Sequence, residues 1–185
     1  MKPFSCLPRS PPQAVAQLCL VRRTNIVKTE DNNMIRNIVL FAALFFVALV
    51  AGAAFAIWID YNPAGMSSAF YAEKMQHAIR VFTIPLPTIV ILGTLFTIAS
   101  ILLARHKRPD LYLLIVASVC IVAVALITAL GNIPINNQIK TWNINSPPPN
   151  WAEVAQKWSS FQAVRTLAAI GALSFLTVTA LVRRK

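Results

Sequence analysis

The chain alternates between long apolar runs and shorter polar connections. Four apolar runs cover residues 37–59, 81–104, 111–130 and 164–182, and only Arg165, near the start of the fourth, places a charge inside any of them. An α-helix rises about 1.5 Å per residue, so about 20 apolar residues cross the hydrocarbon core of a bilayer. We therefore predict an all-α membrane protein with four transmembrane helices.

The polar connections between these runs predict shorter elements. A turn signal at 62–65 is followed by a pattern that predicts a helix over 68–80. The third run stops at 131–134, where a glycine and a proline predict a helix terminus followed by a helix breaker. Residues 152–162 predict an amphipathic helix that leads into the fourth span.

The first 33 residues differ from the rest of the chain. Residues 1–33 contain prolines and several basic residues but no long apolar run, and Met34 directly precedes the first apolar run. We predict that residues 1–33 are a disordered tail, and that Met34 is a real or alternative start. Residues 34–185 then form a single transmembrane domain.

The composition indicates which partner the chain contacts, the lipid bilayer or a nucleic acid. Hydrophobic residues make up 57% of the chain and charged residues only 12%, whereas soluble domains carry about 25% charged residues. The net charge of +11 would indicate nucleic acid if it lay on one soluble face. The basic residues instead form short clusters between apolar runs. The predicted partner is therefore the lipid bilayer, and nucleic-acid binding is excluded.

The basic clusters also predict the orientation in the membrane. Four basic residues lie between Arg22 and Arg36, three lie at 105–108, and three end the chain at 183–185. The positive-inside rule places these clusters on the cytoplasmic side. We expect a multi-pass protein of the cell membrane, an up-down-up-down four-helix bundle with both termini in the cytoplasm.

Several kinds of chemistry are excluded by the residues present. The three cysteines form no Cys-x-x-Cys pair, which argues against a disulfide framework or a thiol oxidoreductase. The predicted topology puts His77 and His106 on opposite sides, so they cannot share a haem iron. No cluster has the spacing of metal ligands, and no glycine-rich phosphate loop is present. We expect neither a metal nor a cofactor.

The predicted topology gathers polar residues at the non-cytoplasmic end of the bundle. The residues expected to form this site are Gln76, His77, Asn132, Asn136, Asn137 and Arg165. Polar groups at membrane depth are costly and are usually paired or functional. His77 is the candidate general base, Arg165 the candidate holder of an anionic oxygen, and the amides the candidate substrate-binding groups.

Each of these residues also has a purely structural interpretation. His77 is then an interfacial histidine at a helix end, and Arg165 extends its side chain to the membrane interface. Asn132 and Asn136 flank Pro134 and then satisfy backbone groups freed by the break. Both interpretations stay open at the level of the sequence.

Three segments together resemble a known family. Met75-Gln76 with Arg80 forms the first, the run Gly-Asn-Ile-Pro-Ile-Asn-Asn at 131–137 the second, and Trp158 with 164–166 the third. In order and spacing they are similar to the anthrone oxygenase-like family of four-helix membrane proteins, over about residues 35–182. Some fungal members are linked to oxidation of a polyketide anthrone to an anthraquinone with molecular oxygen and no evident cofactor. Most bacterial relatives have no established function.

Two functional hypotheses follow. The first is a cofactor-independent oxygenase of phenolic or polyketide-like substrates, in which a flat hydrophobic aromatic molecule binds in the bundle. The second is a non-enzymatic membrane scaffold, or a small-molecule- or lipid-binding protein. Small residues at positions 48, 52 and 56 recur every four residues, which favours close helix association and a homo-oligomer.

Overall fold

A computed structural model describes residues 12–104 and 108–183, with side chains from Glu30 onward except at 105–109. Within these ranges the regular elements are all helices, joined by turns and loops that contain one isolated β-bridge between Asn143 and Ser146. The elements are α1 (Pro12–Asp60), α2 (Ser68–Phe82), α3 (Pro85–Leu102), α4 (Arg108–Ile127), the π-helical segment η1 (Thr128–Asn132), α5 (Ile133–Lys140) and α6 (Trp151–Arg183). The all-α prediction is confirmed, as is the short helix expected over 68–80.

Four helical stretches of the described residues are long and apolar enough to cross a membrane. They are Glu30–Asp60, Pro85–Leu102, Asp110–Lys140 and Trp151–Arg183. This agrees with the four spans predicted from the apolar runs. The helix expected over 152–162 is not a separate element, because α6 runs without interruption from Trp151 to Arg183.

The chain divides into two compact units, Met1–Asn37 and Ile38–Lys185. In the first unit α1 begins at Pro12, so the described residues before Met34 are helical. Proline is tolerated in a first helical turn, and the alanine, glutamine and leucine residues after it are good helix formers. That residues 1–33 form a tail separate from the transmembrane domain stays a prediction. Residues 1–11 of the predicted tail lie outside the described residues, and the domain boundary at Met34 stays a prediction.

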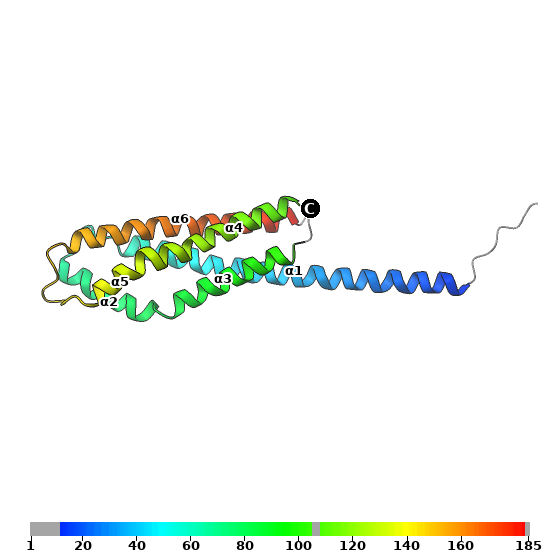
Figure 1. Cartoon of the computed structure of the whole chain (residues 1–185), viewed down its shortest axis with the longest axis horizontal. Coiled ribbons are helices and arrows are strands. Elements are labelled where there is room, and N and C mark those ends of the chain that lie inside the picture. Colours follow the sequence, from blue (N-terminus) through cyan, green and yellow to red (C-terminus); the bar gives the residue numbers. More distant parts are fainter. Residues whose placement is uncertain (1–11, 105–107, 184–185) are drawn as a thin grey trace, which may run out of the picture. The chain divides into compact units, whose positions relative to one another are not determined.

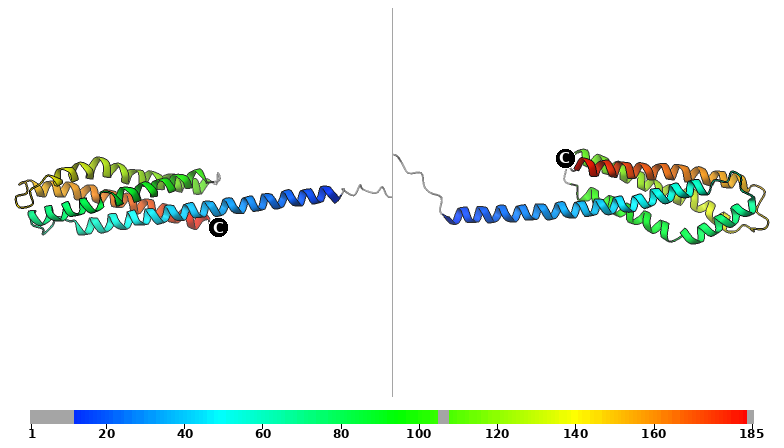
Figure 2. Two further views of the ribbon diagram at one scale, coloured as in Figure 1. Left: turned by 90° about the horizontal axis from the view of Figure 1, so that it is seen from below. Right: turned by 180° about the vertical axis from the view of Figure 1, so that it is seen from behind.

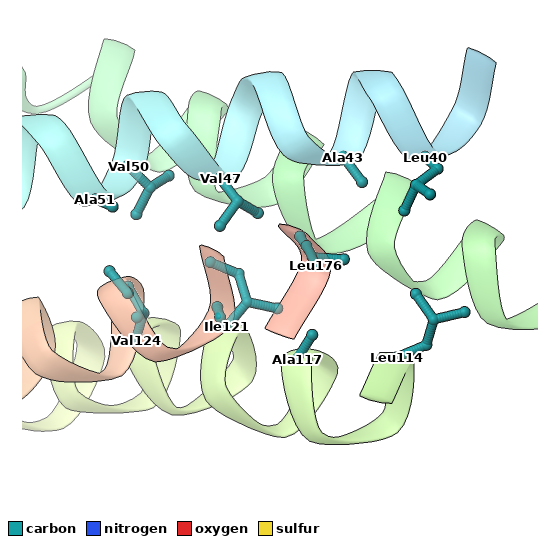
Figure 3. Close-up of a cluster of buried hydrophobic side chains, with 12 residues drawn as sticks. Leu40, Ala43, Val47, Val50, Ala51, Leu114, Ala117, Ile121, Val124 and Leu176 are labelled. Carbon is teal, nitrogen blue, oxygen red and sulfur yellow. The ribbon is translucent and has the colours of Figure 1, made fainter. Parts of the chain in front are cut away.

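In the second unit the long helices pack through small and branched apolar side chains. Helix α4 lies alongside both α6 and α3 (Figure 1). Val47 and Val50 of α1 point toward Ile121 of α4, and Leu176 of α6 lies beside them (Figure 3). Burial of such side chains removes apolar surface and gives dense packing. We name this cluster the mid-bundle core.

Helices α2 and α5 lie at one end of the unit (Figure 2) and pack against each other. A second cluster of buried residues lies at this end. It contains Tyr71 and Met75 of α2, Ile139 of α5 and Trp158 of α6. The aromatic rings give this cluster more bulk per residue than the alanine-rich mid-bundle core. We name it the aromatic end.

The expected break at Pro134 is wrong. Helix α4 continues through η1 into α5, so the helical stretch reaches Lys140. The Ile133 N–H donates to the Thr128 carbonyl, which is the wider i→i+5 bond of a π-helix. The widened turn ends at Asn132, and Pro134 follows in the first turn of α5, a position where proline is tolerated.

The small-residue stripe of α1 faces outward. Ala48, Gly52 and Ala56 are exposed, whereas Ala43 and Ala51 are buried in the mid-bundle core. The stripe therefore does not mediate packing within the second unit. Its proposed role in a homo-oligomer stays a prediction.

Candidate functional site

A cavity of about 200 Å³ opens within the second unit beside the aromatic end. Its walls come from the end of α1, from α2 and the start of α3, from η1 and α5, and from α6. The described residues that line it are Ile57, Tyr61, Met75, Ala78, Ile79, Phe82, Thr83, Leu86, Pro87, Thr128, Asn132, Ile133, Asn136, Asn137, Lys140, Trp158 and Arg165. The lining is mostly apolar with a few polar groups, which is typical of a small-molecule site.

One wall carries polar side chains at regular spacing. Thr128, Asn132, Asn136 and Lys140 line the cavity and are four residues apart. Residues four apart share a helix face, and the π-helical turn adjusts the register within this stretch. The stripe runs from the partly buried Thr128 to the exposed Lys140.

Gly131 allows the π-helical turn to approach α6 closely. A Cβ atom at this position would lie 2.7 Å from two atoms of the Phe161 ring. That distance is far inside van der Waals contact, so any other residue here displaces either the ring or η1. Gly131 therefore fixes how closely this wall of the cavity approaches α6.

Arg165 is the more buried of the two cations that line the cavity. Its guanidinium donates to the Thr128 hydroxyl at 3.3 Å and to the Gln162 side-chain oxygen. Gln162 is fully buried and in turn donates to the Ala54 carbonyl at 2.9 Å, which ties α6 to α1. The Nε atom of Arg165 is buried without a hydrogen-bond partner. These partners are all neutral, so the guanidinium charge is solvated by dipoles and not by a carboxylate.

Two asparagines of the predicted site have different environments. The Asn136 side-chain oxygen accepts a hydrogen bond from the Trp158 indole N–H at 2.8 Å. Asn132 is only 1% exposed, its amide nitrogen lies 3.4 Å from the Trp158 carbonyl, and its side-chain oxygen has no partner. A buried polar atom without a partner costs about 1–3 kcal/mol. The side-chain oxygen of Asn132 is therefore a buried acceptor whose hydrogen-bonding capacity is unused.

Four of the six predicted site residues line the cavity: Asn132, Asn136, Asn137 and Arg165. Gln76 does not. Its side-chain nitrogen donates to the backbone carbonyls of Ile139 and Trp142, at 3.0 and 2.9 Å, and so ties α2 to the end of α5. His77 is exposed and is not among the lining residues. Its role as a base stays a prediction from the sequence that no contact here supports.

Tyr61 closes the cavity at the end of α1. Lys74 lies 4.8 Å from the centre of its ring and forms an ion pair with Asp60 at 2.8 Å. Burial, together with the negative charge of Asp60, raises the pKa of Tyr61. Tyr61 is therefore a neutral phenol that can donate a hydrogen bond into the cavity.

Residues 75–175 match the sequence model of the family described as anthrone oxygenase. The chain belongs to this family. The matched segment contains every lining residue of the cavity except Ile57 and Tyr61. Neither a curated protein nor a solved structure gives a significant match to the chain.

The sequence did not identify several residues of the cavity. Thr128 and Lys140 were missed, although they share a four-residue spacing with Asn132 and Asn136 that was available as a signal. Trp158 was noted only as part of the third family segment, whereas it lines the cavity and its indole N–H donates to the Asn136 side-chain oxygen. Phe82 and Leu86 carry no polar group, so only the packing of α2 and α3 shows that they belong to the site.

Proposed function

We propose that the chain is a membrane-embedded, cofactor-independent oxygenase that converts a phenolic, polyketide-like anthrone to an anthraquinone. The observation that carries this proposal is the cavity itself. It lies almost entirely within the segment that matches the family, and it is lined mainly by apolar residues. Of its two lining cations, Lys140 is exposed, whereas Arg165 is partly buried and held by neutral partners. An apolar cavity suits both a flat aromatic molecule and dissolved oxygen.

The proposed reaction turns a ring CH₂ group into a carbonyl. Loss of one proton from this acidic CH₂ gives an enolate, whose negative oxygen Arg165 stabilises. The electron-rich carbon then forms a bond to O₂, and cleavage of the O–O bond with loss of the second hydrogen leaves the ketone. One oxygen atom enters the product and the other leaves as water, so O₂ accepts the four electrons.

The test is oxygen consumption by the purified protein in lipid nanodiscs supplied with anthrone. We expect consumption above that of protein-free nanodiscs, and one ¹⁸O atom in the anthraquinone formed under ¹⁸O₂. Arg165→Met should abolish the difference. Arg80→Met is the matched control, because it removes an exposed arginine that does not line the cavity. Equal rates with and without protein contradict the proposal.

A second function is favoured by a specific observation. Among the described lining residues there is no carboxylate or imidazole, the usual general bases of proton abstraction. A protein that only binds a small hydrophobic molecule or lipid needs no base. Mass spectrometry that finds a retained small molecule, together with no oxygen consumption, would favour this binding function over the oxygenase.

We also propose that the second unit is an up-down-up-down bundle in the cell membrane with both termini in the cytoplasm. The three clusters of basic residues support this orientation through the positive-inside rule. In a variant without native cysteines, cysteines at Asn62 and Asn145 should react with an impermeant maleimide added to intact cells. A cysteine at Lys185 should react only after the cells are permeabilised. Labelling of Asn62 and Asn145 from different sides contradicts the topology.

A further inference from the structure

The charged and titratable groups around the cavity are few. Among the described lining residues they are Arg165 on α6, Lys140 on α5 and Tyr61 after α1. Helices α2 and α3 contribute only apolar residues and Thr83 to the wall. The ion pair nearest to this group is Lys74–Asp60 beside Tyr61, and Lys74 balances that carboxylate.

The position of Arg165 distinguishes it from the two other basic residues near the cavity. Lys140 is exposed, so water screens its charge. Lys74 has the Asp60 carboxylate as its partner. Arg165 has only the Thr128 hydroxyl and the Gln162 amide as partners, and its Nε atom is buried. Within the described part of the chain, Arg165 is the cavity cation that is both shielded from water and without a counter-ion.

A shielded guanidinium without a counter-ion strongly favours an anion beside it. An opposite charge within about 4–6 Å lowers the pKa of an acid by about 1–3 units. A general base in the cavity would also increase the ionised fraction of the ligand, because it would accept the ligand's proton. The described lining residues include no carboxylate or imidazole that could act as this base. The cavity therefore has the group that stabilises an anion and lacks the group that would produce one by direct proton transfer.

We propose that the cavity binds its acidic ligand, a phenol or an enolisable ketone, in the ionised form, with Arg165 as the counter-ion and no side chain as base. This inference rests on the proposed function of the same cavity. The O–H or C–H bond breaks heterolytically, the electron pair stays on the ligand, and the proton passes to water at the exposed rim near Asn137 and Lys140. The anion that reacts with oxygen is thus formed by binding.

The experiment uses 2-hydroxyanthraquinone, whose absorbance changes when its phenol ionises and which has no CH₂ group to oxidise. Its pKa is measured by titration in phosphatidylcholine nanodiscs that contain the wild-type protein, and in protein-free nanodiscs as the reference. We expect the acid dissociation constant to be at least about tenfold larger in the protein, which corresponds to about 1.4 kcal/mol. Absence of binding, or a pKa equal to or above the reference, overturns the proposal.

Three variants assign the effect to the guanidinium. Arg165→Met should return the probe's pKa to the reference, whereas Arg80→Met should leave the shift intact. Gln162→Glu tests the same point without deletion of the arginine, because it places a carboxylate beside the guanidinium. We expect the acid dissociation constant of the bound probe to be at least about threefold smaller in Gln162→Glu than in the wild type. A shift that survives both Arg165→Met and Gln162→Glu overturns the proposal.

The readout separates this inference from the proposed oxygenase. A lowered probe pKa that depends on Arg165, without oxygen consumption on anthrone, supports an anion-binding cavity and contradicts the oxygenase. Oxygen consumption with an unshifted probe contradicts the anion-binding inference and leaves the oxygenase intact. The same titration is made with His77→Ala, for which we expect the shift to persist. If the shift were lost in this variant, the imidazole would act in the site, and the proposal that no side chain serves as base would be overturned.

Discussion

The mid-bundle core and the cavity end of the second unit satisfy their polar groups in opposite ways. In the middle of the bundle, hydroxyl groups bond within their own helix: Thr97 donates to the Gly93 carbonyl at 2.7 Å, and Thr179 donates to Phe175 at 2.8 Å. Such i→i−4 bonds need no neighbouring helix. Among the described residues of the mid-bundle core, the helices contact one another through apolar side chains.

At the cavity end, polar side chains connect different elements. Gln162 of α6 bonds to Ala54 of α1, Gln76 of α2 bonds to Ile139 and Trp142, and Trp158 of α6 bonds to Asn136 of α5. In an apolar medium each of these bonds is costly to break. The geometry of the site is therefore held by specific hydrogen bonds, whereas the mid-bundle core tolerates substitution by residues of similar volume.

Loss of the Gln162 amide should give the largest effect of this comparison. Gln162→Leu removes a donor to Ala54 and an acceptor for the Arg165 guanidinium, both at a fully buried position. We expect the free energy of unfolding to fall by about 2–4 kcal/mol, because a hydrogen bond to a charged group contributes more than a hydrogen bond between neutral groups. Denaturant titration of the protein in detergent micelles measures it.

The matched control is Thr97→Val in the mid-bundle core. It removes a fully buried hydroxyl that bonds only to its own helix. We expect the free energy of unfolding to change by less than about 1 kcal/mol. If Thr97→Val destabilised the protein as much as Gln162→Leu, bonds between helices would not be what distinguishes the two regions.

The second prediction uses two glycines. Gly131→Ala should destabilise the protein by about 1–3 kcal/mol, because the new methyl group overlaps the Phe161 ring, whose nearest atoms lie 2.7 Å from where that methyl carbon would stand. Gly52→Ala in α1 meets nothing within 4 Å and should leave the stability equal or raise it by up to about 1 kcal/mol, as expected for alanine in a helix. Thermal unfolding of both variants in the same nanodiscs tests the pair. Equal melting temperatures for the two variants would contradict the conclusion that the close approach of η1 to α6 requires glycine at position 131.

The third prediction separates stability from binding. Asn132→Leu removes a buried side-chain oxygen that has no partner, at the cost of one long bond of 3.4 Å to the Trp158 carbonyl. We expect the free energy of unfolding to change by less than about 1 kcal/mol or to increase. Binding of 2-hydroxyanthraquinone should weaken, because the cavity loses a polar group. Asn137→Leu, at an exposed lining position, should change both quantities less.

The apolar pattern was sufficient to predict the helical architecture but not the ends of its elements. Four long apolar runs determine four membrane-length helices, because length and composition decide that question. The same pattern predicted that the third helix stops before Pro134. The π-helical turn carries the chain past Pro134 and includes Gly131, where a Cβ atom would overlap the ring of Phe161, a residue far away in the sequence.

The site was predicted in part for a similar reason. Asn132, Asn136, Asn137 and Arg165 were found because polar residues at helix ends are conspicuous in an apolar chain. His77 was chosen for its chemistry. Whether it lines the cavity depends on the rotation of α2 about its axis, and this helix turns Met75 and Ile79 inward instead. The apolar residues Tyr71, Met75 and Ile79 recur every four residues and already predict the buried face of α2, which leaves His77 off that face; the choice of His77 by its chemistry overlooked this signal.

Substitution of His77 should give the smallest effect, because this residue has suitable chemistry for a base but lies outside the cavity lining. His77→Ala removes an exposed imidazole that is not among the residues lining the cavity. We expect stability within about 0.5 kcal/mol of the wild type, and an unchanged rate of oxygen consumption on anthrone from mildly acidic to mildly basic pH. Arg165→Met in the same assay should lose the activity. A rate that falls in His77→Ala, with the largest fall at the higher pH values where a neutral imidazole can accept a proton, would restore the imidazole as the base and would require α2 to rotate when substrate binds.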